Sequence, residues 1–126
     1  DLEQQQCIVV RRDTGQKKPI KLHEVKQEIK AMLTQMQNEM YQKAKEQLEK
    51  AILPVTSWDA FIAGIEQKKL IKAPFCLQPS CEEAIKAKTQ GVSSRNIPLT
   101  NEPLLAEQCV HCKEKSKANV YFSKAY

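Results

Sequence analysis

The chain has 126 residues, of which 41% are hydrophobic and 28% are charged, and its formal net charge is +5 at pH 7. This length and composition predict a single soluble domain over residues 1–126, and no apolar run approaches a transmembrane length, so we expect no membrane partner. No signal peptide is present at the opening Asp1, and the cysteine count is odd, which together favour a cytoplasmic protein with reduced thiols.

The first predicted element is a buried strand over residues 7–10, an apolar, β-branched run followed by the turn signal Asp13-Thr14-Gly15. Cys7 begins this run, far from the other cysteines, and is expected to be a buried core thiol.

A basic patch follows within residues 11–21. Its positive side chains include Arg11, Arg12, Lys17 and Lys18, whereas Asp13 is the only acidic residue. Such a patch attracts phosphate backbones, but a solvated, charged hairpin or loop explains it equally well. No aromatic side chain is interleaved, so base stacking is not indicated.

A long helix is predicted between Pro19 and Pro54, because apolar side chains recur at steps of three and four over residues 22–52. Its apolar stripe includes all three methionines. We expect this stripe to be core, lying across a sheet; the alternative is that one end of the helix projects to meet another domain.

A second helix begins near Thr56, which offers an N-cap with Asp59 three residues on. Its apolar face carries Trp58, Phe61, Ile62 and Ile65. A strand over residues 70–75 follows, and Pro74 requires that this strand end or lie at an edge there, because proline lacks the ladder N–H.

A third helix is predicted from Cys81, where Ser80 and Glu83 form a capping box, and Gly91 is placed for its C′ position. The helix dipole and free amides of this first turn favour a thiolate at Cys81. Two further strands are predicted, over residues 92–99 and 118–122. The fold expected is a two-layer α+β domain, βαβαββ-like, with helices on one face of a mixed four-stranded sheet that begins with the strand 7–10.

Four of the five cysteines form two short pairs, Cys76/Cys81 and Cys109/Cys112, separated by twenty-seven residues. Two thiolates so close in sequence can face one ion, and two such pairs complete a tetrahedral zinc site. A closed four-sulfur shell leaves no position for water, so one structural zinc per chain is expected. Free thiols are the next interpretation, and disulfides come last. His111 could replace a cysteine, but its place inside the second pair favours a solvated histidine beside the site.

Catalytic motifs are not found in the sequence: there is no Gly-rich phosphate loop, no HExxH and no serine in a nucleophile setting. The histidines are isolated and the acidic residues are scattered among lysines. An independent catalytic site is therefore not expected.

Five short segments occur in an order that resembles a known family. They are Val9-Val10-Arg11-Arg12-Asp13-Thr14-Gly15, Ala73-Pro74-Phe75-Cys76, Cys81-Glu82-Glu83-Ala84-Ile85-Lys86, Cys109-Val110-His111-Cys112 and Ser123-Lys124-Ala125-Tyr126. Together they resemble the C-terminal zinc-binding domain of prolyl-tRNA synthetases of the archaeal and eukaryotic type, which are class II aminoacyl-tRNA synthetases. The resemblance covers essentially the whole chain, although residues 93–97 follow the family pattern only loosely.

This resemblance implies the tail of a longer proline–tRNA ligase, with Asp1-Leu2 as the end of a preceding anticodon-binding domain. ATP and Mg²⁺ would then be bound only by the parent's catalytic domain. The zinc in such enzymes is structural, matched by the four cysteines. The terminal carboxylate, here on Tyr126, would point toward the active site. The implied partners are the parent's own catalytic and anticodon-binding domains, tRNA(Pro) and a second copy of the parent.

The sequence is compatible with three functions. The first is a zinc-stabilised, non-catalytic accessory domain of the ligase, with tRNA backbone contacts from Arg11, Arg12, Lys17 and Lys18. The second is a free-standing, zinc-ribbon-like nucleic-acid binder, and the third is a protein-interaction domain that uses the methionine-rich helix.

Overall fold

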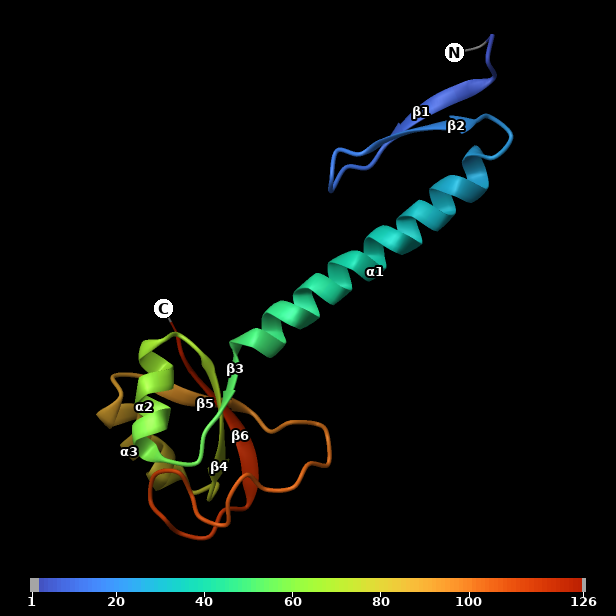
Figure 1. Cartoon of the computed structure of the whole chain (residues 1–126). Helices are drawn as coiled ribbons and strands as arrows, with labels where there is room; N and C mark the ends of the chain where they lie inside the picture. The colour runs from blue at the N-terminus through green and yellow to red at the C-terminus, as the bar shows by residue number, and fades with distance from the viewer. Residues whose placement is uncertain (1–2, 126) are drawn as a thin grey trace. The chain divides into compact units, whose positions relative to one another are not determined.

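The computed structural model describes residues 3–125 (Figure 1). By its contacts the chain divides into two compact units, residues 1–47 and 48–126, which we describe separately; the sequence analysis treats the whole chain as one domain. Within the described residues there are three helices and six strands, and none of these helices is both long and apolar enough to cross a lipid bilayer.

The first unit opens with a β-hairpin. Strand β1 (Gln6–Val10) pairs antiparallel with β2 (Lys17–Lys21), and the turn between them is closed by the Gly15 N–H, which donates to the Arg11 carbonyl at 2.8 Å. A strand at residues 7–10 is confirmed, but it is not buried as predicted, since Ile8 and Val10 are 69% and 52% exposed. Its place in the main sheet is also wrong, because β1 pairs with β2 in a separate two-stranded sheet. Cys7 is only partly buried and lies outside the core cluster, so the expected core thiol is also wrong.

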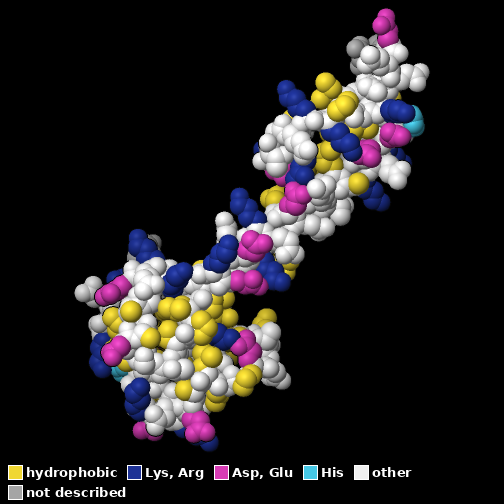
Figure 2. Space-filling view, viewed as in Figure 1, with side chains coloured by type: hydrophobic (Ala, Val, Ile, Leu, Met, Phe, Trp, Pro, Cys, Tyr) yellow, Lys and Arg dark blue, Asp and Glu magenta, His cyan; other side chains and the backbone are white. Residues whose placement is uncertain are grey.

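Helix α1 (Val25–Ala51) confirms the predicted long helix, but not the role of its apolar stripe. None of its residues is buried, and Leu33 and Met40 are 59% and 61% exposed. The stripe is therefore not core, because a two-stranded hairpin offers too little surface to cover a helix of 27 residues. Figure 2 shows charged side chains of both signs along this helix, as expected of a solvated surface.

The second unit has the predicted βαβαββ order, with a three-residue strand in the first place. Its elements are β3 (Ile52–Pro54), α2 (Trp58–Glu66), β4 (Leu70–Phe75), α3 (Pro79–Lys88), β5 (Val92–Asn96) and β6 (Ala118–Lys124). The sheet order is β3-β4-β6-β5, with β3 parallel to β4 and the other pairs antiparallel, so the predicted mixed four-stranded sheet is confirmed (Figure 1). β3 takes the position that the sequence analysis gave to residues 7–10.

The core lies on one face of this sheet. Phe122 of β6 is fully buried, and its ring centroid lies 5.3 Å from that of Phe61 in α2 and 5.2 Å from that of Phe75 in β4. Ile85 of α3 joins the same cluster, so both short helices pack on one face, as predicted. Residues two apart in a strand point to the same face of the sheet, which is why Val120 and Phe122 of β6 are both buried in this core.

The opposite face of the sheet is covered in part by residues 102–105. Asn119 on β6 ties this segment down: its Oδ1 accepts from the Leu105 N–H at 2.9 Å, and its Nδ2 donates to the Pro103 carbonyl at 2.9 Å. Lys72 on β4 forms an ion pair with Glu102 of the same segment. Pro74 is tolerated in β4 because the pairing with β3 ends at Lys72.

The ends of the short helices differ from the predicted caps. Ser57, not Thr56, caps α2, and its Oγ accepts from the Ala60 N–H at 3.3 Å. Helix α3 begins at Pro79 with Gln78 as N-cap, so the capping box at Ser80 is wrong; proline is pre-organised for the first helical position and starts the helix earlier. Gly91 has a φ of +112° and closes the C-terminus through its N–H, which donates to the Lys86 carbonyl at 2.9 Å, one position later than predicted.

Candidate metal centre

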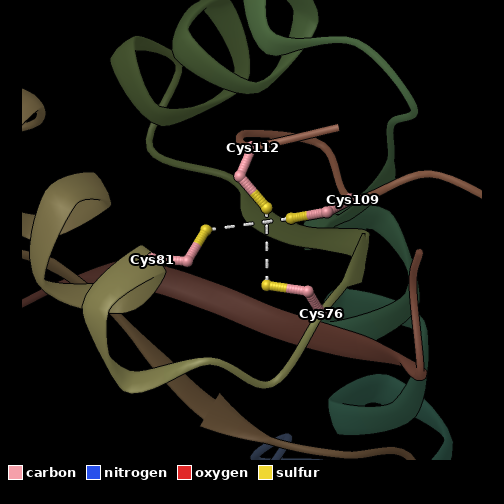
Figure 3. A group of neighbouring side chains, drawn as sticks. All are labelled: Cys76, Cys81, Cys109 and Cys112. Carbon is pink, nitrogen blue, oxygen red and sulfur yellow. Dashed lines mark hydrogen bonds between the residues drawn. The ribbon is translucent and has the colours of Figure 1, made fainter. Parts of the chain in front are cut away.

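The structure brings the four paired cysteines together at one end of the sheet (Figure 3). Cys76 directly follows β4, Cys81 lies in the first turn of α3, and Cys109 and Cys112 lie in the turn that precedes β6. Their sulfur atoms are all within 4.8 Å of one another, with Sγ–Sγ distances of 3.9 Å for Cys81/Cys109 and 3.6 Å for Cys76/Cys112. The predicted constellation is therefore confirmed as a group of four cysteines that can hold a metal ion.

These distances fit a tetrahedral thiolate site. A zinc–sulfur bond of about 2.3 Å places the sulfurs of a regular tetrahedron about 3.8 Å apart. A disulfide requires about 2.05 Å, so all five cysteines are free thiols in this structure. Burial adds to the fit, because Cys76, Cys81 and Cys109 are shielded from water while their sulfurs converge.

The backbone holds the second cysteine pair against the end of β4. The Val110 N–H donates to the Pro74 carbonyl at 2.9 Å, and the Lys117 N–H donates to the Phe75 carbonyl at 2.8 Å. Leu77 and Lys113, each the residue after a cysteine, have φ values of 60° and 66°, which turn the chain sharply at both pairs. These bonds and turns anchor the second cysteine pair to the end of β4.

The four thiols do not share one ionisation behaviour. Burial raises the pKa of Cys76 and of Cys81, so the helix N-terminus alone does not make Cys81 a thiolate, contrary to our expectation. Burial also acts to raise the pKa of Cys109, but backbone N–H groups of residues 112, 111 and 76 point at its sulfur and hold this pKa below the ordinary value. A divalent cation is what the cluster needs to ionise fully.

His111 lies beside the cluster, as we expected, and is partly exposed while it contacts three other side chains. Its Nδ1 lies 3.3 Å from Cys81 Sγ, its Nε2 lies 2.9 Å from Lys88 Nζ, and its ring meets the Trp58 ring edge-on at 4.9 Å. Burial, then the positive charges of Lys88 and Lys113, lower the pKa of His111 and favour the neutral imidazole. No spacing in the sequence predicts this group of side chains, since its members come from three separate segments.

The four basic residues singled out in the first unit differ in their surroundings. Arg11 is only 6% exposed, and its guanidinium donates to Asp13 at 2.6 Å and to Glu39 of α1 at 2.5 Å. Lys18 pairs with Glu28 at 2.6 Å. Arg12 and Lys17 are exposed. Tyr126 and Asp1-Leu2, for which the sequence analysis also made predictions, lie outside the described residues.

The Arg11 ion pairs predict an acid-sensitive first unit. Hydrogen bonds from Arg11 are the main cause that lowers the pKa of Asp13 and of Glu39, so their stabilising effect is complete above the ordinary carboxyl pKa of about 4 and is lost as the pH falls below it. Exchange of the Gly15 amide hydrogen should therefore quicken, relative to its intrinsic rate, between about pH 4 and pH 2. Arg11→Met should abolish this dependence, whereas Arg12→Met should keep it; matching profiles for the two variants would contradict the assignment.

Fold and site together define a small α+β domain with a cluster of four cysteines that can hold a metal ion. A family model described as "Prolyl-tRNA synthetase, C-terminal" matches residues 58–126, which include all four cysteines. Over its whole length the chain is 37% identical to a proline–tRNA ligase from Oceanobacillus iheyensis, of which it covers 26%. It is likewise 34% identical to a bifunctional glutamate/proline–tRNA ligase from Drosophila melanogaster, of which it covers 8%.

A solved structure agrees with these relatives. The prolyl-tRNA synthetase of Cryptosporidium parvum, in complex with L-proline and AMP, superposes on all of this chain with a TM-score of 0.91 and 31% identity, over 27% of its own length. The chain therefore belongs to the family of prolyl-tRNA synthetase C-terminal domains, and it spans about a quarter of the length of the single-function ligases it matches.

Proposed function

We propose that this chain is the C-terminal part of a proline–tRNA ligase and acts there as a zinc-stabilised accessory domain that is not catalytic by itself. The observation that carries the proposal is the continuous match of the whole chain, in sequence and in structure, to proteins of that name. The match runs through the cysteine cluster, so fold, site and family point to the same role.

The proposed metal is one structural Zn²⁺ per chain, held by Cys76, Cys81, Cys109 and Cys112. Sulfur ligands at tetrahedral spacing suit zinc, and four of them close the shell. Such a site supplies folding energy and offers no open position for a water nucleophile. Joining proline to tRNA, with ATP and Mg²⁺, is accordingly proposed for the catalytic domain of the parent.

The proposed link to that catalytic domain is the C-terminal carboxylate of Tyr126. In a full-length ligase that ends in this chain, adding one glycine after Tyr126 would displace the carboxylate by one residue. We expect proline-dependent pyrophosphate exchange to fall by about 100-fold, because a displacement of about 1 Å can cost that much. Tyr126→Phe keeps the carboxylate and is the matched control. Unchanged exchange in the extended enzyme would refute this role.

Contacts with the tRNA backbone are proposed for Arg12, Lys17 and Lys18. Lys18 would exchange its exposed ion pair with Glu28 for a phosphate, whereas Arg11 would first have to leave two carboxylates from a buried position. Replacing these three exposed residues by alanine should reduce the slope of log affinity for tRNA against log salt by about two to three, since each phosphate contact contributes about 0.7 to 0.9. The triple variant of Lys86, Lys115 and Lys117 removes equal charge from the second unit. An equal reduction of this slope in both triple variants would show that only the net charge of the chain matters, and not the position of the three residues.

The setting proposed for the parent is the cytoplasm, where thiols stay reduced and available to zinc. Its proposed partners are its own catalytic and anticodon-binding domains, tRNA(Pro) and a second copy of itself. A free-standing nucleic-acid binder has less support, because three acidic residues, Asp13, Glu28 and Glu39, already pair with the basic patch.

A further inference from the structure

We propose that His111 is a positioning residue of the metal centre, which donates a hydrogen bond from Nδ1–H to the Cys81 thiolate while Lys88 fixes its tautomer. The inference rests on the proposed zinc site and adds a residue outside the ligand set. Its geometric basis is the pair of contacts at opposite ends of one imidazole, 3.3 Å from Nδ1 to Cys81 Sγ and 2.9 Å from Nε2 to Lys88 Nζ.

The tautomer follows from the donors available. The ammonium group of Lys88 has three N–H donors and no acceptor, so the His111 Nε2 that faces it must accept. A neutral imidazole carries one proton, which therefore sits on Nδ1 and points at the Cys81 sulfur. A thiolate accepts such a bond with the added strength of its charge.

The ring is held in this orientation from one further side, and the residue there also lies near Lys88. Trp58 of α2 meets it edge-on at 4.9 Å between ring centroids, and Lys88 Nζ lies 6.0 Å from the Trp58 ring centroid. Cys81 and Lys88 both belong to α3, two turns apart, so one helix presents the sulfur and the ammonium to the two imidazole nitrogens.

Two of the other ligands have backbone donors, whereas the contact at the Cys81 sulfur comes from a side chain. Backbone N–H groups serve Cys109, from residues 112 and 111, and Cys76, from residue 78. Cys81 sits in the first turn of α3, where Pro79 contributes no N–H, and its sulfur lies beside His111 instead. A donor on this sulfur disperses the charge of a four-thiolate zinc site and slows the loss of the metal.

The test uses the full 126-residue chain loaded with zinc. Two variants separate the hydrogen bond from the shape of the ring: His111→Leu removes the donor, and His111→Asn places an amide N–H where Nδ1 stood. We expect His111→Leu to transfer zinc to a chromogenic chelator about tenfold faster than the parent chain, and His111→Asn to remain close to the parent. Lys86→Met, an exposed lysine of the same helix, is the control and should change nothing.

A spectroscopic measurement keeps the inference testable if a variant fails to fold. Long-range ¹H–¹⁵N correlation on the zinc-loaded parent chain should show a neutral His111 protonated on Nδ1, and the ¹¹³Cd-substituted chain should show scalar coupling between Hδ1 and the metal. Protonation on Nε2, or equal transfer rates in the Leu and Asn variants, would overturn the role of His111 while one zinc per chain keeps the proposed centre intact. A folded chain that binds no zinc would overturn the centre itself.

Discussion

Cys109→Ser should bind zinc poorly and leave the second unit unfolded at 25 °C. Serine lacks the thiolate, and backbone N–H groups of residues 112, 111 and 76 point at the Cys109 sulfur. Structural zinc sites contribute about 10 to 16 kcal/mol to folding, which is as large as the whole stability of a typical domain, roughly 5 to 15 kcal/mol. Metal content by atomic emission and thermal unfolding followed by Trp58 fluorescence would measure both effects.

Cys7→Ser is the matched control, because Cys7 lies in the first unit and outside the cluster. This variant should keep one zinc per chain and the melting temperature of the parent. Trp58 is the only tryptophan and stacks on Phe61 at 5.0 Å, so its emission reports on the core of the second unit. If Cys109→Ser, measured in the presence of chelator, melts at the same temperature as the zinc-loaded parent chain, the metal does not hold this fold.

Phe122→Ala should destabilise the zinc-loaded second unit by about 3 to 5 kcal/mol, the usual cost of removing a buried phenylalanine. Phe122 has no exposed surface and lies between Phe61 and Phe75, so its loss opens a cavity where α2 meets the sheet. Urea unfolding monitored by Trp58 emission gives the free energy of unfolding.

Tyr121→Ala provides the comparison for this measurement, because Tyr121 is the neighbouring residue on the other, partly exposed face of β6. Its loss should cost clearly less than that of Phe122. Equal costs for the two variants would mean that the aromatic cluster is not the centre of the core.

Local patterns in the sequence were enough to predict most of the second unit. Alternation in β6 and the helical spacing of Phe61 and Ile65 each depend on a few neighbouring residues, and both predictions are confirmed. The cysteine pairs were predictable for the same reason, since two short spacings already limit where the four sulfurs can meet.

The failures have different causes. The run at residues 7–10 pairs with β2, its neighbour across the turn, but β2 is mostly lysine and shows no strand pattern, and the three residues of β3 are too few to show one. The stripe on α1 gave the apolar face of the helix but not what would cover it. The contact of His111 with Lys88 and Trp58 depends on the folded positions of three segments, so no spacing rule could find it.

The metal centre is the claim on which the rest depends, and X-ray absorption at the zinc edge tests it most directly. The purified chain should contain one zinc, surrounded by four sulfur atoms at about 2.3 Å and no nitrogen. Such a shell would agree with a ligand set of Cys76, Cys81, Cys109 and Cys112 and with His111 outside it. A nitrogen ligand in the shell, or a folded chain without zinc, would contradict the account.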